Sequence, residues 1–185
     1  ATNIVMFDCG NPCHAFDLAV TGDRIVVKTA QEGEELELVG SEKIKAKLKS
    51  TDLVITTPAL DYESDPSSPR RGEKNLAIAG VKGGTNSGIS ETTTDLVIEV
   101  ANFDPTATRK TARRIALSDA AKRFENDLSP EHAAYAMREL SGLLLEMFPE
   151  ATFEEIVDVY PMPQEARTLS FSMPRVNALL GAAIS

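Results

Sequence analysis

The segment GVKGGTNSGISETTTDLVIEVANFDPTATRKTARRIALSDAAKRFE, residues 80–125, brings three kinds of signal into one continuous run. It opens with a loop that contains Gly80, Gly83, Gly84 and Gly88. An apolar strand and then a helix with several basic residues follow. Because glycine lets a backbone approach a ligand closely or adopt a positive φ, we expect the functional site to be built around this segment.

The strand of this segment, Leu96–Val100, carries one carboxylate, Glu99, among apolar residues. Burying a carboxylate is costly unless the group has a partner or a function. Such residues are candidates for functional sites, and a structural ion pair is the common alternative.

The helix of this segment begins at Asp104, a good N-cap residue, with Pro105 at its first position. Four basic residues share one helix face through their spacing: Arg109, Lys110, Arg113 and Arg114. This stripe is either a solvated face or a surface that contacts phosphate.

The composition limits the classes of partner. The chain has 185 residues and a net charge of −9, which argues against a surface generally coated with nucleic acid and against DNA as a partner. It has no apolar run long enough for a membrane helix and no visible signal peptide, so we expect a cytoplasmic protein without a membrane partner. A start at Ala1 without a Met suggests a piece excised from a longer protein.

Two cysteines and a histidine lie close together as Cys9-Gly-Asn-Pro-Cys13-His14. A structural metal needs three or four ligands at workable spacing, and the other histidine, His132, is far along the chain. We therefore expect no metal and two reduced thiols.

The order of elements predicts an α+β fold, with a strand-rich N-terminal half that forms a mixed or antiparallel sheet, two helices in the C-terminal half, and then short strands. The helices are expected from Asp104 and from Ser129-Pro130, and a helix-like PRVNALLG ends the chain. Residues 59–75 read as a polar surface excursion. The expected strands are Asn3–Asp8, Arg24–Ala30, Glu34–Val39, Lys43–Leu48, Asp52–Thr57, Leu76–Ala79, Leu96–Val100, Phe153–Val159 and Thr168–Ser172.

Four segments, in order along the chain, resemble the editing domain of the β subunit of bacterial phenylalanyl-tRNA synthetase. They are TNIVMFDCGNPCHAFD from Thr2, LAIAGVKGGTNSG from Leu76, LVIEVANFDP from Leu96, and RKTARR followed by RFE at Arg123. The tail from about residue 160 is similar to the start of the next domain. The resemblance thus implies an editing domain over residues 1–160, and a linker with a truncated next domain over 161–185.

The resemblance implies a function. That enzyme joins phenylalanine to its tRNA, and its editing domain hydrolyses the ester formed when tyrosine is attached by mistake. The expected partners are tRNA and the α subunit in an α2β2 enzyme. ATP and Mg²⁺ belong to the synthetic site elsewhere, so no cofactor is expected in this fragment.

The resemblance also assigns residues to the editing pocket. It implies that His14 is catalytic, and that substrate is bound by Thr2, Asn3, Gly83, Gly84, Glu99, Ser118 and Ala120. Glu99 would accept a hydrogen bond from the tyrosine hydroxyl, so that phenylalanine leaves a polar group unpaired and is rejected. His14 would position the water or the ribose hydroxyls, with N–H groups of the glycine loop stabilising the oxyanion. Direct attack by water is preferred, because no nucleophile–base pair stands out.

Two alternatives stay open at this point. The chain departs from the family pattern at Asn126-Asp127, where a basic residue and a glycine are usual. This motivates a module that docks tRNA or assembles subunits after losing its editing activity. The other alternative is an independent sugar- or peptide-binding α+β domain.

Overall fold

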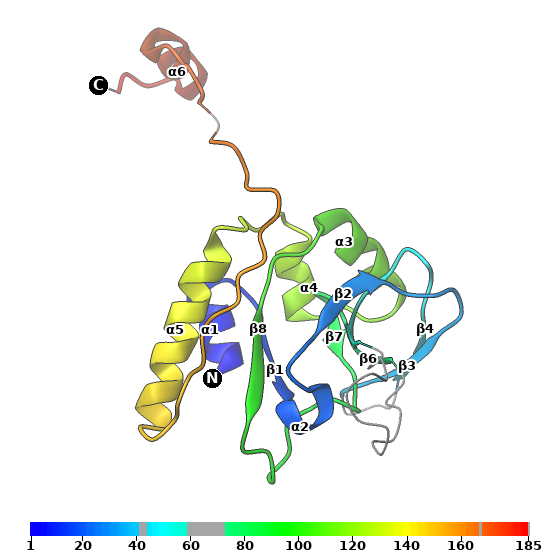
Figure 1. The fold of residues 1–185 in the computed structure, drawn as a ribbon. Helices are drawn as coiled ribbons and strands as arrows, with labels where there is room; N and C mark the ends of the chain where they lie inside the picture. The colour runs from blue at the N-terminus through cyan, green and yellow to red at the C-terminus, as the bar shows by residue number, and fades with distance from the viewer. Residues whose placement is uncertain (41–43, 59–72, 167, 185) are drawn as a thin grey trace. The chain divides into compact units, whose positions relative to one another are not determined.

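The computed structural model describes residues 1–40, 44–58, 73–166 and 168–184 (Figure 1). It divides into two compact units, Ala1–Thr152 and Phe153–Ser185. The expected boundary at residue 160 stays a prediction. The predicted excursion over 59–75 lies mostly outside the described residues, as does Lys43.

Every strand pairing in the described part of the first unit is antiparallel. β1 pairs with β8, β3 pairs with β4, and a four-stranded sheet has the order β2-β5-β6-β7. The strands are β1 (Cys13–Asp17), β2 (Val26–Thr29), β3 (Glu35–Leu38), β4 (Ile44–Lys47), β5 (Leu53–Thr57), β6 (Lys74–Ile78), β7 (Lys82–Gly83) and β8 (Leu96–Val100).

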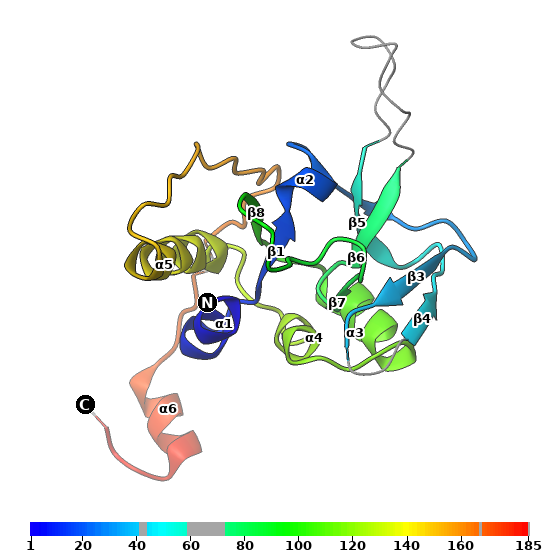
Figure 2. The same cartoon turned by 90° about the horizontal axis from the view of Figure 1, so that it is seen from below.

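The ribbon formed by β1 and β8 is covered on both faces, as Figures 1 and 2 show. Helices α1 (Thr2–Cys9) and α5 (His132–Met147) cover one face, where Ile98 and Val100 pack with Leu140. On the other face, Phe16 and Val97 pack with residues of the four-stranded sheet. Successive side chains of a strand point to opposite faces. The packing on the two faces therefore determines which side chains of β1 and β8 point toward the helices and which point toward the four-stranded sheet.

A third core joins the β3–β4 pair to helices α3 (Pro105–Arg114) and α4 (Asp119–Phe124). Leu38 and Leu48 are fully buried there, and Ala112 and Ala121 bring the two helices close. Helix α3 begins as predicted: the Asp104 carboxylate accepts a hydrogen bond from the Ala107 N–H (2.6 Å), with Pro105 at the first position. The short helix α2 (Leu18–Thr21) completes this unit.

The α+β class is confirmed, and so is the strand-rich N-terminal half. Strands lie within the predicted ranges Arg24–Ala30, Glu34–Val39, Lys43–Leu48, Asp52–Thr57 and Leu96–Val100, and β6 overlaps Leu76–Ala79. The predicted helix after Ser129-Pro130 is α5.

Three predicted details are wrong. Asn3–Asp8 is not a strand but most of α1, which ends at Gly10 in the left-handed conformation (φ 86°). Besides the two expected C-terminal helices, α3 and α5, and α6 (Met173–Leu180) in the expected PRVNALLG, the described residues contain the short α4, which was not expected. Phe153–Val159 and Thr168–Ser172 are not strands, because neither has a partner strand to complete a ladder.

The second unit contains α6, and none of its described residues is buried. In the helix-like PRVNALLG, residues 174–180 lie in α6 and Gly181 is its C-cap. Among the described helices, none combines the length and the apolar character needed to cross a membrane.

Candidate functional site

Two polar side chains, His14 and Glu99, lie directly opposite each other in the β1–β8 ribbon. Phe16 and Val97, two residues further along each strand, also form a pair and pack toward the four-stranded sheet. His14 and Glu99 therefore point to that same face. Side chains directly opposite in an antiparallel pair have Cβ atoms about 4.5–5.5 Å apart, so one small group can contact both.

The two side chains line a cavity of about 80 Å³ between the ribbon and the four-stranded sheet. The remaining wall comes from the start of β1, from β5 to β7 with the turn between β6 and β7, from the segment before α3 and from α4, and it is mostly apolar. It is formed by Pro12, Cys13, Ile55, Ala77, Ile78, Gly80, Val81, Lys82, Gly83, Phe103, Ala120 and Phe124. This volume is small beside the roughly 300–1,000 Å³ of typical ligand pockets, so it suits one small part of a larger ligand.

Glu99 has lost most of its contact with water, and this raises the pKa of its carboxyl group to about 7. No side chain in the described part of the chain donates a hydrogen bond or forms an ion pair with it. A carboxyl group in this state is divided between its neutral and ionised forms near neutral pH. It can therefore donate a hydrogen bond to a ligand or accept one from it.

The His14 imidazole is held by packing and not by polar partners. It meets the Phe16 ring edge-on, with centroids 4.5 Å apart. It also lies against the backbone of Gly83, where an added Cβ would be 2.9 Å from Cε1 of His14. Burial lowers the pKa of His14 below its ordinary value of 6.5, so the ring is neutral at neutral pH and can accept a proton.

Cys13, next to His14, is a poor nucleophile. Burial, the neighbouring Cys9 and Glu99 together raise the pKa of its thiol to about 12. Since the thiolate is the reactive form, Cys13 is suited to packing. Both cysteines are free, and no group of three or more His, Cys, Asp or Glu residues able to hold a metal ion is found among the described residues.

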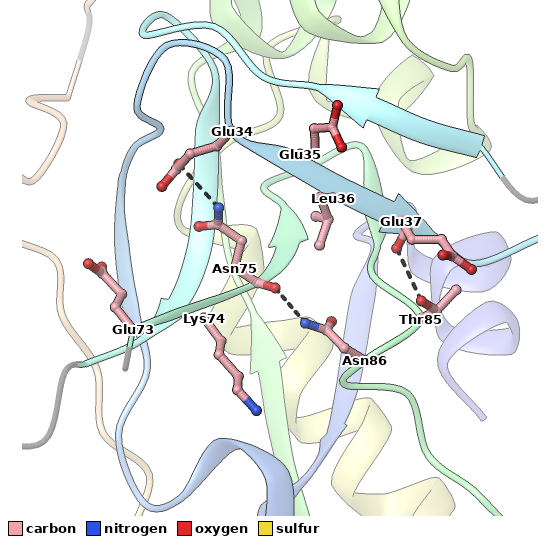
Figure 3. Close-up of a pocket in the computed structure, with 9 residues that line it drawn as sticks. All are labelled: Glu34, Glu35, Leu36, Glu37, Glu73, Lys74, Asn75, Thr85 and Asn86. Atoms are coloured by element: carbon pink, nitrogen blue, oxygen red, sulfur yellow. Dashed lines mark hydrogen bonds between the residues drawn. The ribbon is translucent and has the colours of Figure 1, made fainter. Parts of the chain in front are cut away.

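A larger cavity of about 430 Å³ lies beside β3 and the start of β6 (Figure 3). Its polar groups bond one another: Asn75 donates to Glu34 (3.2 Å), and Asn86 donates to the Asn75 carbonyl (2.9 Å). The wall is acidic, which is unfavourable for a phosphate-bearing ligand. It is formed by Glu34, Glu35, Leu36, Glu37, Glu73, Lys74, Asn75, Thr85 and Asn86.

Comparison with known proteins gives the family of this fold and site. The B3/4 domain family matches residues 1–149, which include both strands of the ribbon and the whole cavity wall. The chain belongs to the B3/4 domain family.

Similar proteins are phenylalanine–tRNA ligase β subunits. The subunit of Porphyromonas gingivalis is 39% identical over 99% of this chain and 21% of its own length. Those of Geobacter sulfurreducens and Thermotoga maritima are 35% and 33% identical over 100% of this chain, and over 21% and 22% of theirs. The B3/4 chain thus spans about a fifth of the length of these relatives.

The B3/4 structure brings four of the predicted site residues together at the small cavity: His14, Gly83, Glu99 and Ala120. Gly84 does not line it. Its position is fixed by close packing, since an added Cβ would lie 2.7 Å from the Leu76 carbonyl oxygen.

The other predicted site residues lie elsewhere. Thr2 and Asn3 are at the start of α1, which packs on α5 and β1. The Ser118 hydroxyl donates to the Val81 carbonyl (2.7 Å) and accepts from the Ala121 N–H (3.0 Å), so it caps α4. None of the three is in the cavity wall.

The basic stripe of α3 is divided. All four residues are exposed, but Arg114 also forms an ion pair with the buried Asp52. Arg114 therefore has a structural partner that the sequence pattern did not indicate.

Sequence reasoning missed the aromatic walls, Phe103 and Phe124, and the basic residue Lys82. The two rings pack edge to face, 5.2 Å apart. Phe103 follows the strand that carries Glu99, and Phe124 is in the segment RFE, so an apolar residue next to each recognised motif was the available signal.

Proposed function

We propose that this B3/4 chain is the editing part of a phenylalanine–tRNA ligase β subunit and hydrolyses tRNA mischarged with tyrosine. The observation that carries the proposal is the pair His14 and Glu99. Both face one cavity, and neither has a hydrogen-bond partner among the described residues. Polar groups left unpaired in a cavity are available to a ligand, and perturbed pKa values are typical of functional sites.

In this proposal the tyrosine ring packs against the edge-to-face pair formed by Phe103 and Phe124, and its hydroxyl bonds Glu99. The small volume of the cavity fits this division, in which the amino-acid side chain enters and the nucleotide stays at the mouth. Phenylalanine lacks the hydroxyl, so its ester would leave Glu99 desolvated and unpaired. A site of this kind discriminates strongly against the analogue without the polar group.

The reaction itself is hydrolysis by one water molecule. Neutral His14 accepts a proton from the water as its oxygen attacks the ester carbonyl carbon, and the proton then passes to the departing ribose oxygen. The products are tyrosine and tRNA with a free terminal hydroxyl. The Gly84 N–H already bonds the Leu76 carbonyl, so we propose that other backbone N–H groups of the glycine loop stabilise the oxyanion.

The rest of the enzyme belongs to the same proposal. The relatives named as phenylalanine–tRNA ligase β subunits support a part in an enzyme that charges tRNA with phenylalanine. We expect this enzyme to be cytoplasmic. We expect an α subunit as partner, an α2β2 assembly, and ATP with Mg²⁺ used outside this chain.

The test is single-turnover deacylation by the complete ligase. His14→Ala should slow hydrolysis of tyrosyl-tRNA by about a hundredfold and leave charging with phenylalanine intact. Glu99→Ala should reduce hydrolysis of the tyrosyl ester more than that of the phenylalanyl ester, by about ten- to a hundredfold in selectivity. Glu91→Ala, an exposed glutamate on the preceding loop, is the matched control.

Equal losses for both esters would remove Glu99 from recognition. If the unaltered enzyme does not deacylate tyrosyl-tRNA at all, the chain is instead a module for docking tRNA or assembling subunits.

A further inference from the structure

Lys82 is the one residue in the wall of the small cavity with a permanent positive charge. It belongs to β7 and precedes Gly83, against which the His14 ring packs. The cation therefore lies on the same wall as the group proposed to activate water.

The backbone at Lys82 is held firmly. Lys82 pairs with Ile78 in β6, and the turn between them contains Gly80 at φ 68°. Beyond β7, the Gly84 N–H donates to the Leu76 carbonyl at 2.7 Å. A side chain on such a fixed backbone can contribute to positioning, because little ordering is needed when a ligand binds.

The charge of Lys82 has no partner among the described residues. Three basic residues are half-buried in the described part of the chain: Lys28, Lys82 and Arg123. Lys28 forms an ion pair with Glu73, and Arg123 donates to the Asp119 carbonyl (2.9 Å) and lies over the Phe7 ring. No described carboxylate or carbonyl accepts a hydrogen bond from the Lys82 ammonium.

An unpaired, half-buried ammonium favours an anionic ligand. The proposed substrate is an amino-acid ester on the terminal nucleotide of tRNA. Its ester and ribose are neutral and its amino group is cationic. The nearest anion is the phosphate on the 5′ side of that nucleotide.

We propose that Lys82 is a positioning residue that binds this terminal phosphate and so holds the ester carbonyl at His14. The inference rests on the proposed editing function and deepens it, since it names the part of the tRNA that the cavity holds. Lys82 acts on binding and on orientation and takes no part in proton transfer.

The test compares two stable ligands: a tyrosyl amide of 3′-aminoadenosine with a 5′-phosphate, and the same compound without it. Their affinities are measured by calorimetry on the complete ligase, with its synthetic site blocked by a non-hydrolysable phenylalanyl-adenylate analogue. The unaltered enzyme should bind the phosphorylated ligand about tenfold more tightly, as expected for one charged hydrogen bond near water. Raising the salt concentration should reduce this preference.

Lys82→Gln should abolish the preference and leave the affinity for the unphosphorylated ligand unchanged. Lys82→Arg should restore it. Lys45→Gln, at an exposed lysine of β4 outside the cavity, is the matched control and should retain it.

A preference that survives in Lys82→Gln, or that is absent from the unaltered enzyme, overturns the role of Lys82 even if tyrosyl-tRNA is hydrolysed. A preference that depends on Lys82 supports that role even if the ester is not hydrolysed, in which case the editing proposal fails alone. Failure to bind either ligand overturns both.

Discussion

Glu99 contributes to how the stability of this chain changes with pH. Its carboxyl group has a pKa of about 7 in the folded state, against an ordinary value of 4.5. Between these values the unfolded chain releases a proton that the folded chain keeps. Glu99 therefore lowers the free energy of unfolding progressively as the pH rises from about 4.5 to about 7.

The prediction is that Glu99→Gln removes this loss. The remaining contribution in the cavity is His14, whose lowered pKa has the opposite sign, because it favours the folded state as the pH rises. The variant should thus gain stability relative to the unaltered chain at pH 8 and not at pH 4. Urea unfolding at both values measures it, with Glu91→Gln as control. An equal effect at both values would contradict the raised pKa.

Gly83 provides the second prediction at this scale. An added Cβ would lie 2.9 Å from Cε1 and 3.1 Å from Nε2 of His14, so Gly83→Ala should displace the imidazole. We expect deacylation of tyrosyl-tRNA to fall toward the rate of His14→Ala, while charging persists. Gly88→Ala, where no atom lies within 4 Å of the new Cβ, is the control.

The double variant Gly83→Ala/His14→Ala tests whether Gly83 acts through His14. If Gly83 acts through His14, the two losses should not add. Additive losses would show that Gly83 contributes by a separate route.

Part of the site could be predicted from the sequence because two of its residues, His14 and Glu99, belong to strands with recognisable patterns. Glu99 in an apolar strand and His14 in its own motif were recognisable, and the register brings them together. The sequence placed the Ser118 hydroxyl in the pocket, but this hydroxyl caps α4. A serine can bind a ligand or cap a helix, and only the tertiary structure shows which hydrogen bond it makes.

At the scale of elements, α1 shows why short apolar runs are ambiguous. The run Ile4–Phe7 is continuous, and periodicity cannot tell a strand from a helix over such a length. The tertiary contacts decide: Val5 and Cys9, one helical turn apart, pack with Leu140 of α5. The six-residue α4 was missed for a related reason, since it is too short for a periodic pattern.

The pairing of α3 with the loop before β5 gives a third prediction. Asp52 is 1% exposed and accepts hydrogen bonds from Thr111 (2.7 Å), the Lys49 N–H (2.8 Å) and Arg114. Burial alone would raise the pKa of Asp52, but these bonds and the charge of Arg114 lower it.

Arg114→Met should therefore leave a buried carboxylate without its cation and cost roughly 1–3 kcal/mol of unfolding free energy, less than for a fully buried pair because Arg114 is itself exposed. The neighbouring exposed Arg113→Met should change it by less than about 0.5 kcal/mol. Chemical denaturation of both variants measures the difference. Equal small effects would show that the ion pair of Arg114 with Asp52 does not stabilise the fold and that Arg114 is only part of a solvated helix face.

At the scale of the whole molecule, the remaining stripe of Arg109, Lys110 and Arg113 concentrates positive charge in a chain of net charge −9. We predict that this stripe contacts tRNA phosphate. Arg109→Glu with Lys110→Glu, in the complete ligase, should weaken tRNA binding. It should also flatten the salt dependence of binding by about one unit of slope for each phosphate that the variant no longer binds.

Lys45→Glu with Lys49→Glu changes the net charge equally at exposed positions in and just after β4, away from α3. It should leave the slope unchanged. If both pairs act alike, the effect comes from net charge and not from a local contact.

The β1–β8 pairing has a consequence for how the chain folds. The two strands lie far apart in the sequence, with β2 to β7 between them, so their contacts have a high contact order. Closing so long a loop is entropically costly before any contact forms, and such pairings slow folding. During synthesis, β1 with His14 cannot pair with β8 until the ribosome has released the chain as far as Glu99. The cavity should therefore be among the last parts of this unit to acquire native structure.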